Sequence, residues 1–454
     1  MHRRRHGRGR SLRANRLKRS LDVGVIGGGT AGSAAAVFLA RAGHRVTLYE
    51  RVPEPRAVGA GITIQPTGLH VLCRLGLYPY IVSRGAQIDR LLCESKSSSK
   101  DKPRRALVDL SYASVADDLF GLGLHRGVLF EALLAAVARE RNITVRNGIE
   151  IVDLARAGSS ERGRASWFVD VHGGRHGPHE LVVVADGARS QLRDDTGTSK
   201  SVSPYPWGAL WFVGKETRDP ESPHAHTLHQ VVDGNQRFLG MLPTGRGPGL
   251  KVGPPLVSLF WSIRCDRIEA WRERGLGPWK EELAELAPEA RGVLDQIDGI
   301  DQVLFASYHD VVMHRWSTRN VVYLGDAAHA TSPQLGQGCN LALWDAMVLA
   351  DVLDAGGREQ NDDDLAQALD RYSRLRGDHL AFYQFSTRML TPFFQGDEAW
   401  LGMLRDLAMP LMARFPITNR LMTLTMFGVV DGFGGRMLQL KLPRREEPNE
   451  PAAG

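Results

Sequence analysis

The chain has 454 residues, 43% of them hydrophobic and 24% charged, which is ordinary for a folded protein and long enough for two or three structural units. The formal net charge of +6 comes from nine basic residues within positions 1–20, and the remainder carries −3. We expect this tail to be a disordered, passive extension, although such a charge run could attract nucleic acid or an anionic membrane. No apolar run follows the arginines or is long enough to span a bilayer, so neither a secretory signal nor a transmembrane helix is expected.

The N-terminal part of the chain predicts a βαβ unit. The β-rich run 22–26 leads into a glycine cluster, residues 31–42 have the small side chains of a closely packed helix, and residues 44–50 supply a second strand. A unit of about 30 residues with this order is the context that a dinucleotide-binding fingerprint requires.

The glycine cluster of this unit has the spacing of that fingerprint. Gly27 permits a tight turn, Gly29 lets the backbone approach a pyrophosphate, and Gly32 allows the helix to pack closely on the strand. The helix N-terminus offers unpaired amides to the anion. Glu50, at the end of the second strand, can accept hydrogen bonds from a ribose and would repel a 2′-phosphate, so FAD or NAD fits better than NADP.

Further elements follow along the chain. We expect a strand hairpin within 88–120 around the polar loop from Ser95 to Arg105, a helix over 127–141, a buried strand over 180–185, and alternating strands from 207 to 305 with one helix near 279–297. A core strand at 320–324, helices at 341–353, 364–395 and 397–428, and a disordered Pro- and Glu-rich tail from 441 complete the chain.

Three segments, 27–32, 185–190 and 325–329, together resemble the flavin-contacting fingerprints of the monooxygenases that are similar to p-hydroxybenzoate hydroxylase. The resemblance covers roughly residues 21–375, and the stretch 323–340 is its most specific part. One departure is Trp344 before Asp345, where many relatives have Glu; we expect this position to support packing. His329 is expected to support the loop rather than to act as a base.

The resemblance implies an α/β fold in which a Rossmann-like FAD-binding domain is interrupted by an antiparallel β-sheet substrate domain and followed by C-terminal helices. The expected divisions are a basic tail at 1–20, FAD-binding parts at 21–87, 121–200 and 306–375, substrate-domain parts at 88–120 and 201–305, a helical region at 376–440 and a tail at 441–454.

The same resemblance implies which residues lie along the FAD. Asp326 would accept a hydrogen bond from the ribityl chain, and the helix that begins near Asn340 would direct its N-terminus toward the flavin pyrimidine. The expected cofactor-binding residues are Gly27, Gly29, Thr30, Ala31, Gly32, Glu50, Arg51, Arg56, Gly61, Arg126, Asp186, Gly187, Asp326, Pro333, Gly336, Gly338, Cys339 and Asn340.

The activity that the resemblance implies is hydroxylation or epoxidation of an aromatic or polyketide-like molecule through a flavin 4a-hydroperoxide. NADPH or NADH would reduce the FAD transiently, since no second nucleotide fingerprint follows a strand. No catalytic side chain is identified. The expected substrate residues, for which ordinary sheet core is an equal interpretation, are Trp211, Phe238, Met241, Pro243 and Trp261.

Several alternatives stay open. A flavin-dependent halogenase would need a Trp-x-Trp-x-Ile-Pro motif that this sequence lacks, whereas a prenyl-chain reductase would differ mainly in its pocket. A non-catalytic FAD-binding module with a basic interaction tail is a third possibility. We expect the methionine-rich C-terminal helices to pack over the substrate domain. The alternative is that they form an apolar entrance or a surface that touches a membrane. The sequence does not identify the substrate, the choice between NADPH and NADH, or the oligomeric state.

Cysteines and histidines give no metal-site pattern. The four cysteines are scattered and indicate reduced thiols in a cytoplasmic protein. His224, His226 and His229 lie in a Pro-flanked polar stretch, and we expect them to have no acidic partner nearby and to bind no metal.

Overall fold

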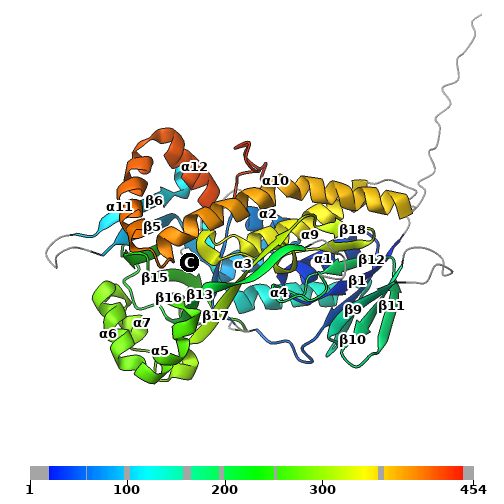
Figure 1. The fold of residues 1–454 in the computed structure, drawn as a ribbon, viewed down its shortest axis with the longest axis horizontal. Coiled ribbons are helices and arrows are strands. Elements are labelled where there is room, and N and C mark those ends of the chain that lie inside the picture. The colour runs from blue at the N-terminus through cyan, green and yellow to red at the C-terminus, as the bar shows by residue number, and fades with distance from the viewer. Residues whose placement is uncertain are drawn as a thin grey trace, which may run out of the picture.

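The computed structural model describes residues 20–57, 59–96, 103–156, 165–193, 199–249, 253–355 and 362–442. The expected disordered tails fall almost wholly outside these residues, as does the centre of the polar loop after Ser95. Figure 1 shows an elongated molecule in which a parallel sheet and a second sheet lie side by side along the long axis, with the long helix α10 (Asp362–Phe394) running past both. No described helix combines the length and apolarity needed to cross a bilayer.

The first sheet has six strands in the order β18-β19-β12-β1-β2-β8, all parallel except for β18. The expected strands at 22–26, 44–50, 180–185 and 320–324 are confirmed with small shifts of their ends. The central strands β1, β12 and β19 are almost continuously apolar because both faces of the sheet are covered, one by helices and the other by a small sheet that contains Phe168 and His179. The strands are β1 (Asp22–Ile26), β2 (Arg45–Glu50), β8 (Ile143–Asn147), β12 (Leu181–Val184), β18 (Ser317–Thr318) and β19 (Val321–Tyr323).

Helices α1 and α9 form the centre of the covering layer. All residues of α1 from Ala31 to Ala40 are buried, and α1 packs against α9, which in turn contacts α2 and α10. The run of alanines in α1 allows this close approach. The helices around this sheet are α1 (Thr30–Arg41), α2 (Pro66–Arg74), α3 (Tyr78–Arg84), α4 (Arg126–Arg139), α8 (Asp326–His329) and α9 (Gly338–Ala355).

The second sheet has seven strands in the order β17-β13-β16-β15-β14-β5-β6. It is antiparallel as expected, with one parallel pair between β14 and β5, and the hairpin expected within 88–120 is confirmed as β5–β6. The last strand runs on to Met313 before the chain returns to the first sheet. The strands are β5 (Arg90–Ser95), β6 (Arg105–Ser111), β13 (Ser199–Lys215), β14 (Thr227–Asp233), β15 (Arg237–Gly245), β16 (Leu256–Arg264) and β17 (Leu304–Met313).

Two helix predictions were wrong in their continuity. The single helix expected near 279–297 is α6 (Leu276–Leu286) and α7 (Arg291–Leu294), divided by a turn at Pro288. A further helix that was not expected, α5 (Ile268–Arg274), precedes α6 and is separated from it by Gly275 at φ +78°. The helix expected over 397–428 is α11 (Ala399–Arg414) and α12 (Pro416–Met426). Phe415 is extended because the residue before a proline is pushed out of the helical region.

Two small sheets complete the described fold. One, at 151–179, was not expected from the sequence. The other lies between α9 and strand β15 of the second sheet and contacts both. They are β9 (Ile151–Arg156), β10 (Ser166–Asp170) and β11 (Arg175–His179) in one sheet, and β3 (Gly61–Ile64), β4 (Ala86–Ile88) and β7 (Gly121–His125) in the other.

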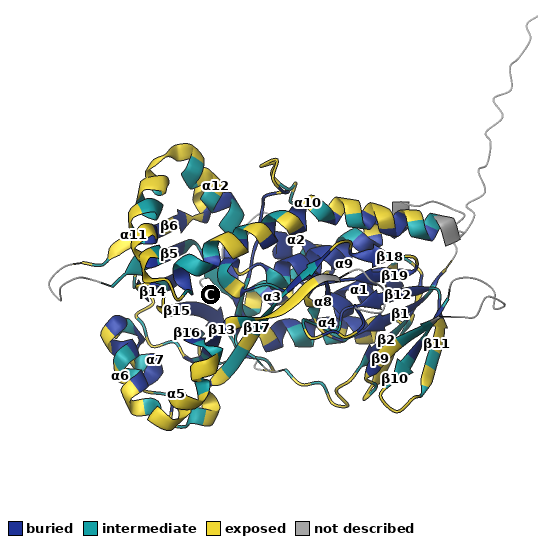
Figure 2. Ribbon diagram, viewed as in Figure 1, coloured by how far each residue is buried: buried dark blue, intermediate teal, exposed yellow. Residues whose placement is uncertain are grey.

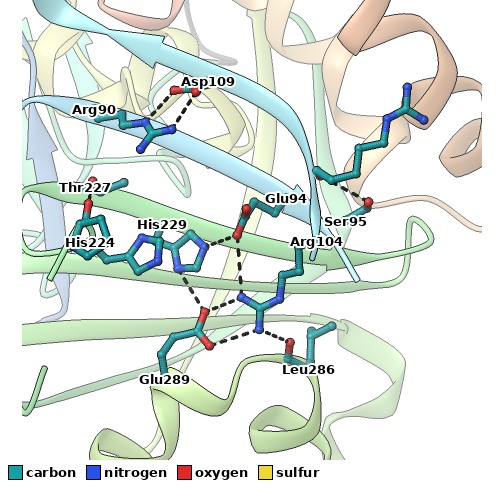
Figure 3. A network of polar contacts seen from close by, with 12 residues as sticks. Arg90, Glu94, Ser95, Arg104, Asp109, His224, Thr227, His229, Leu286 and Glu289 are labelled. Carbon is teal, nitrogen blue, oxygen red and sulfur yellow. Dashed lines mark hydrogen bonds and ion pairs between the residues drawn. The ribbon is translucent and has the colours of Figure 1, made fainter. Parts of the chain in front are cut away.

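A buried ionic network ties β5 and β14 to the turn after α6 (Figure 3). His229 Nε2 lies 2.9 Å from Glu94 Oε2, and its Nδ1 lies 3.4 Å from Glu289. Arg104 bridges the same two carboxylates and binds Glu289 Oε1 at 2.5 Å. The expectation of no acidic partner was therefore wrong for His229, because its partners come from distant segments. No group of acidic, histidine or cysteine side chains among the described residues is arranged to hold a metal.

This network predicts that the protein loses stability on mild acidification. Burial lowers the pKa of His229 despite the nearby carboxylates, and Arg104 holds the pKa of Glu289 low despite burial. The contribution of the neutral His229 is complete above about pH 6.5 and is lost as the pH falls below it, whereas that of Glu289 is lost only below about pH 4.5. We expect the melting temperature to fall between pH 7.5 and 5.5, with a slope of at most about 1.4 kcal/mol per pH unit for one histidine. His229→Gln should flatten the profile in a thermal-shift series, whereas exposed His226→Gln should leave it unchanged.

Candidate flavin site and substrate face

The glycine loop between β1 and α1 is held by contacts that only glycine permits. Gly27 has φ +99°, and a Cβ there would lie 2.4 Å from the carbonyl oxygen of Ala185. A Cβ on Gly32 would lie 1.9 Å from the carbonyl oxygen of Gly27. Gly29 differs, since it is exposed and a Cβ there would meet nothing within 4 Å. The loop is therefore closely packed on the side of Gly27 and Gly32 and open to solvent at Gly29, where α1 begins.

Glu50 lies directly beneath this loop. Strand β2 runs parallel to β1, so its last residue reaches the same edge of the sheet as the glycine turn. The Glu50 carboxylate accepts hydrogen bonds from the backbone N–H of Gly28 and of Val52, both at 2.8 Å. The strand order thus places an acceptor for ribose hydroxyls beside the helix N-terminus.

Asp186 follows β12 at the same edge. The Ala185 N–H binds the Ile26 carbonyl at 2.8 Å, which brings the Asp186-Gly187 turn beside the glycine loop. Asp186 Oδ1 is buried without a hydrogen-bond partner, and burial raises the pKa of this carboxyl to about 6. Gly187 has φ +91° and open space where a Cβ would be. A buried, unsatisfied oxygen at the edge of an open site fits a donor supplied by a bound molecule.

The third segment brings a second helix N-terminus to the same place. Gly325 ends the strand β19, and a Cβ there would lie 3.0 Å from Cβ of Ala31 and 3.3 Å from Cβ of Ala342. The first turns of α1 and α9 therefore meet beside Gly325. The exposed Asp326 has its Oδ1 3.9 Å from the position of a Cβ on Gly338, the first residue of α9. Two positive helix ends thus face one open region.

A buried ionic group lies beneath the Gly325–His329 turn. Asp345 of α9 accepts hydrogen bonds from the Gly325 N–H at 2.9 Å, His329 Nε2 at 2.6 Å and Arg376 Nε at 2.7 Å. Burial alone would raise the pKa of Asp345, but His329 and Arg376 outweigh it and lower the pKa to about 2. His329 supports the loop, as expected, and Asp345 is a positioning residue for it.

Asn340 connects the glycine-containing segment 336–338, which precedes it, to strand β3. Its Nδ2 donates to the carbonyl oxygens of Thr63 at 3.1 Å and Gly336 at 3.2 Å, and its Oδ1 accepts from the Gln65 N–H at 2.9 Å. The amide of the Asn340 side chain is therefore fully engaged with the protein. Pro333 begins a short 3-10 turn, and Gly336 closes it in the left-handed region at φ +62°.

The remaining expected cofactor residues are distributed unevenly. Arg126 begins α4 and lies over Gly59, and both Arg126 and Asp326 are close enough to influence Cys339, whose pKa burial raises to about 12. Thr30 hydrogen-bonds the same thiol. Arg51 is exposed, 4.0 Å from Glu150 and close enough to Asp186 to lower its pKa. Gly61 packs against Ser258 and pairs with His125, the residue before Arg126, whereas Arg56 is exposed and paired with Glu54.

The second sheet presents two different faces, and the expected substrate residues divide between them. Phe238 and Trp211 contact Phe260 on the face toward the C-terminal helices, at ring-centroid distances of 5.4 and 5.1 Å. Met241 and Trp261 point the other way and pack among α5–α7. The period of two in a strand explains the division. Pro243 contacts β7 through its carbonyl, which lies against Gly123.

A group of aromatic residues that the sequence did not reveal connects this face to the loop 333–337 before α9, which we call the flavin loop. Tyr112 stacks on Phe427 at 3.5 Å and donates its hydroxyl to Gln65 Oε1 at 2.6 Å. Gln337 binds the Met426 carbonyl at 2.9 Å, and Phe394 contacts Phe238 at 5.7 Å. These residues come from six distant segments with no local motif, so only their packing could identify them.

Taken together, the open edge of a parallel sheet, two helix N-termini and an acceptor at the end of β2 define a dinucleotide-binding protein. The residues present fit FAD: the space above Gly29 admits a pyrophosphate, and the Asp186 oxygen lacks a donor.

Comparison with known proteins identifies the family. Residues 20–381 match the model described as "FAD binding domain", and the chain belongs to this family. It is 30% identical over 362 residues to a probable 2-heptyl-3-hydroxy-4(1H)-quinolone synthase of Rhodococcus erythropolis, covering 77% of this chain and 83% of that protein. It is 28% identical to the 6-methylpretetramide 4-monooxygenase of Streptomyces rimosus, over 75% of this chain and 77% of that one.

Solved structures share the fold. HpxO of Klebsiella pneumoniae in complex with FAD and uric acid superposes with a TM-score of 0.74 at 21% identity, over 92% of this chain and 99% of that one. The expected fold class is confirmed, and the protein is an FAD-dependent monooxygenase, an oxidoreductase for which NAD(P)H is the usual donor. The halogenase, reductase and non-catalytic alternatives are not favoured.

Replacing Asp326 with alanine is expected to weaken FAD retention at least about tenfold, the loss of one charge-assisted hydrogen bond. The side chain is exposed at the meeting point of two helix ends, so the fold should tolerate the change. Equilibrium dialysis with visible absorbance measures the change. Asp118→Ala, equally exposed but distant in sequence from the three segments, serves as the control. Retention of FAD as tight as in the unaltered protein would show that Asp326 does not contact the cofactor.

Proposed function

We propose that this monooxygenase hydroxylates or epoxidises an aromatic or polyketide-like small molecule that binds between the second sheet and the C-terminal helices. The observation that carries the proposal is the aromatic face formed by Phe238, Phe260 and Phe394, which reaches the flavin loop through the Gln337–Met426 contact. Aromatic walls bind flat apolar substrates through their large contact area. The relatives named for a quinolone and for 6-methylpretetramide support the same substrate class.

FAD, reduced by NADPH or NADH, supplies the chemistry that activates molecular oxygen. The chain's own contribution is to hold the cofactor with its three fingerprints and to exclude water from the aromatic face. Tyr112 stays protonated because burial raises the pKa of its phenol far above neutrality, so it remains a donor to Gln65. We include in the proposal that Trp211 and Phe238 contact the substrate and that the protein works in the cytoplasm, where its free thiols stay reduced.

The first test is a visible absorption spectrum of the purified protein, followed by NADPH or NADH addition in air. We expect a yellow protein whose slow nicotinamide oxidation is accelerated by members of a panel of alkylquinolones, fused-ring polyketides and hydroxylated N-heteroaromatic acids. A yellow protein inert to both nicotinamides would contradict the proposal and would favour an enzyme served by a separate reductase.

A matched pair of variants on β15 tests the substrate face. Phe238→Ala should raise KM for an accepted substrate about tenfold, since about 1–3 kcal/mol of apolar contact is removed, and should leave FAD content unchanged. Met241→Leu, three residues along the strand and on the opposite face, should change neither quantity. Steady-state kinetics measure both, and an unchanged KM in Phe238→Ala would place the substrate elsewhere.

A further inference from the structure

Large apolar side chains are concentrated on the outside of one helical hairpin. The described residues include 21 exposed large hydrophobic side chains, and nine of these lie between Ala399 and Leu421. Figure 2 shows this exposure along the outer sides of α11 and α12. We call the segment Ala399–Met426 the apolar hairpin. Contiguous apolar surface of this kind marks an interaction site.

The exposed side chains form an ordered surface. Met403, Leu407 and Leu411 follow one another at intervals of four residues along α11 and are 69%, 67% and 51% exposed. Such a stripe covers one side of a helix. Phe415 and Ile417, 56% and 83% exposed, project from the turn where α11 meets α12. The stripe and the turn together give the hairpin a continuous apolar edge.

The inner side of the hairpin is firmly attached to the rest of the molecule. Arg405 is buried and donates from one nitrogen to the carbonyls of Gly234 at 2.8 Å and Phe393 at 3.0 Å. Met409, Met422 and Met426 pack on the aromatic cluster of the second sheet. The apolar outer residues are therefore presented by an anchored element and not by a loosely packed tail.

The distribution of charged residues around the apolar hairpin indicates which kind of surface it binds. Residues 407–430 contain no aspartate or glutamate, while Arg414 and Arg420 are exposed beside the apolar turn. Asp406, within the stripe, is paired with Arg405 at 2.6 Å, so the outer turn of the hairpin carries only unpaired positive charge. An apolar turn with exposed arginines is complementary to the interface of a bilayer that contains anionic lipids. A second copy of the chain meeting the same surface would bring these arginines together without a carboxylate from this segment to pair with them.

We propose that the apolar hairpin docks on the surface of an anionic phospholipid bilayer, with Phe415, Ile417 and the Met403–Leu411 stripe in the interfacial layer. The hairpin lies along the surface, and the rest of the molecule stays in water.

Vesicle co-sedimentation with the full chain tests the proposal. Binding is expected to phosphatidylcholine vesicles containing phosphatidylglycerol, and to persist in part at high salt, where attraction of the basic residues 1–20 is screened. Phe415→Glu/Ile417→Glu should weaken binding at least about tenfold. Val171→Glu replaces an equally exposed residue, 55%, in the turn between β10 and β11 and should bind as the unaltered chain does.

A second measurement does not depend on the folding of a charged variant. Trp400 is 54% exposed at the start of α11, so brominated phospholipids should quench part of the tryptophan fluorescence of the unaltered chain. Trp400→Phe should bind vesicles equally well and lose that quenched fraction. FAD absorbance and circular dichroism verify that each variant is folded.

Three results would overturn the proposal: no co-sedimentation with the vesicles that contain phosphatidylglycerol, equal binding by the double glutamate variant, or no quenching by brominated lipid. A dimer in sedimentation velocity that dissociates in the double variant would instead assign the surface to a second copy of the chain.

Discussion

Gly32→Ala is expected to yield a protein that no longer retains FAD. The added methyl would lie 1.9 Å from the carbonyl oxygen of Gly27, so the glycine loop or the start of α1 must move. Forced overpacking of this kind costs about 1–3 kcal/mol or more of folding stability. Visible absorbance of the purified variant reports the cofactor, and urea denaturation reports the stability.

Gly29→Ala separates cofactor contact from loop geometry. Gly29 has φ −73° and ψ −166°, which alanine adopts freely, and its Cβ would meet nothing within 4 Å of the protein. Stability should therefore change by no more than about 0.5 kcal/mol, while FAD affinity should fall at least about tenfold because the methyl occupies the pyrophosphate position. Gly277→Ala, also in open space but in α6, is the control for both quantities. Undiminished affinity in Gly29→Ala would place the pyrophosphate elsewhere.

Asp345→Ala is expected to cost about 3–5 kcal/mol of stability, the usual effect of removing one partner from a buried ion pair. His329 and Arg376 would remain buried without their carboxylate, and the Gly325 N–H would lose its acceptor. Because the pKa of Asp345 is lowered to about 2, its contribution is complete above about pH 4 and is lost only as the pH falls toward 2. Urea denaturation at pH 7 measures the cost.

Two further variants show whether this cost reflects the ion pair. Asp351→Ala lies on the same helix in an exposed pair with Arg74 at 2.7 Å and should cost no more than about 1 kcal/mol. Asp345→Asn/Arg376→Met removes both charges and should be less destabilised than the sum of the single changes. Strict additivity would mean that Asp345 and Arg376 do not stabilise each other.

The cofactor side of the molecule could be predicted from the sequence to a large extent. The turn at Gly27, the close packing at Gly32 and the carboxylate at the end of β2 follow from constraints that act within a few residues. The strands of the parallel sheet were also predictable, because side chains buried on both faces form continuous apolar runs. The predicted helix boundaries were wrong where a short turn or a single residue interrupts a helical stretch, as at Pro288 and Phe415.

The substrate side could not be predicted in the same way. Phe238 and Met241 are equally apolar, and only the register of β15 between its neighbours shows that one faces the aromatic cluster and the other α5–α7. Tyr112 meets Gln65 and Phe427 across gaps of 47 and 315 residues, for which no local pattern exists.

The sequence by itself determined the class of fold, the flavin fingerprints and the cofactor, because steric limits on glycine and the apolar periodicity of strands are local. Only the tertiary structure decided that His229 lies between two carboxylates, that Asp345 binds a buried histidine and a buried arginine, and that the hairpin of α11 and α12 leaves its apolar side exposed. Those properties depend on which distant segments pack together. Burial and charge pairing are set by the whole molecule and not by any stretch of its chain.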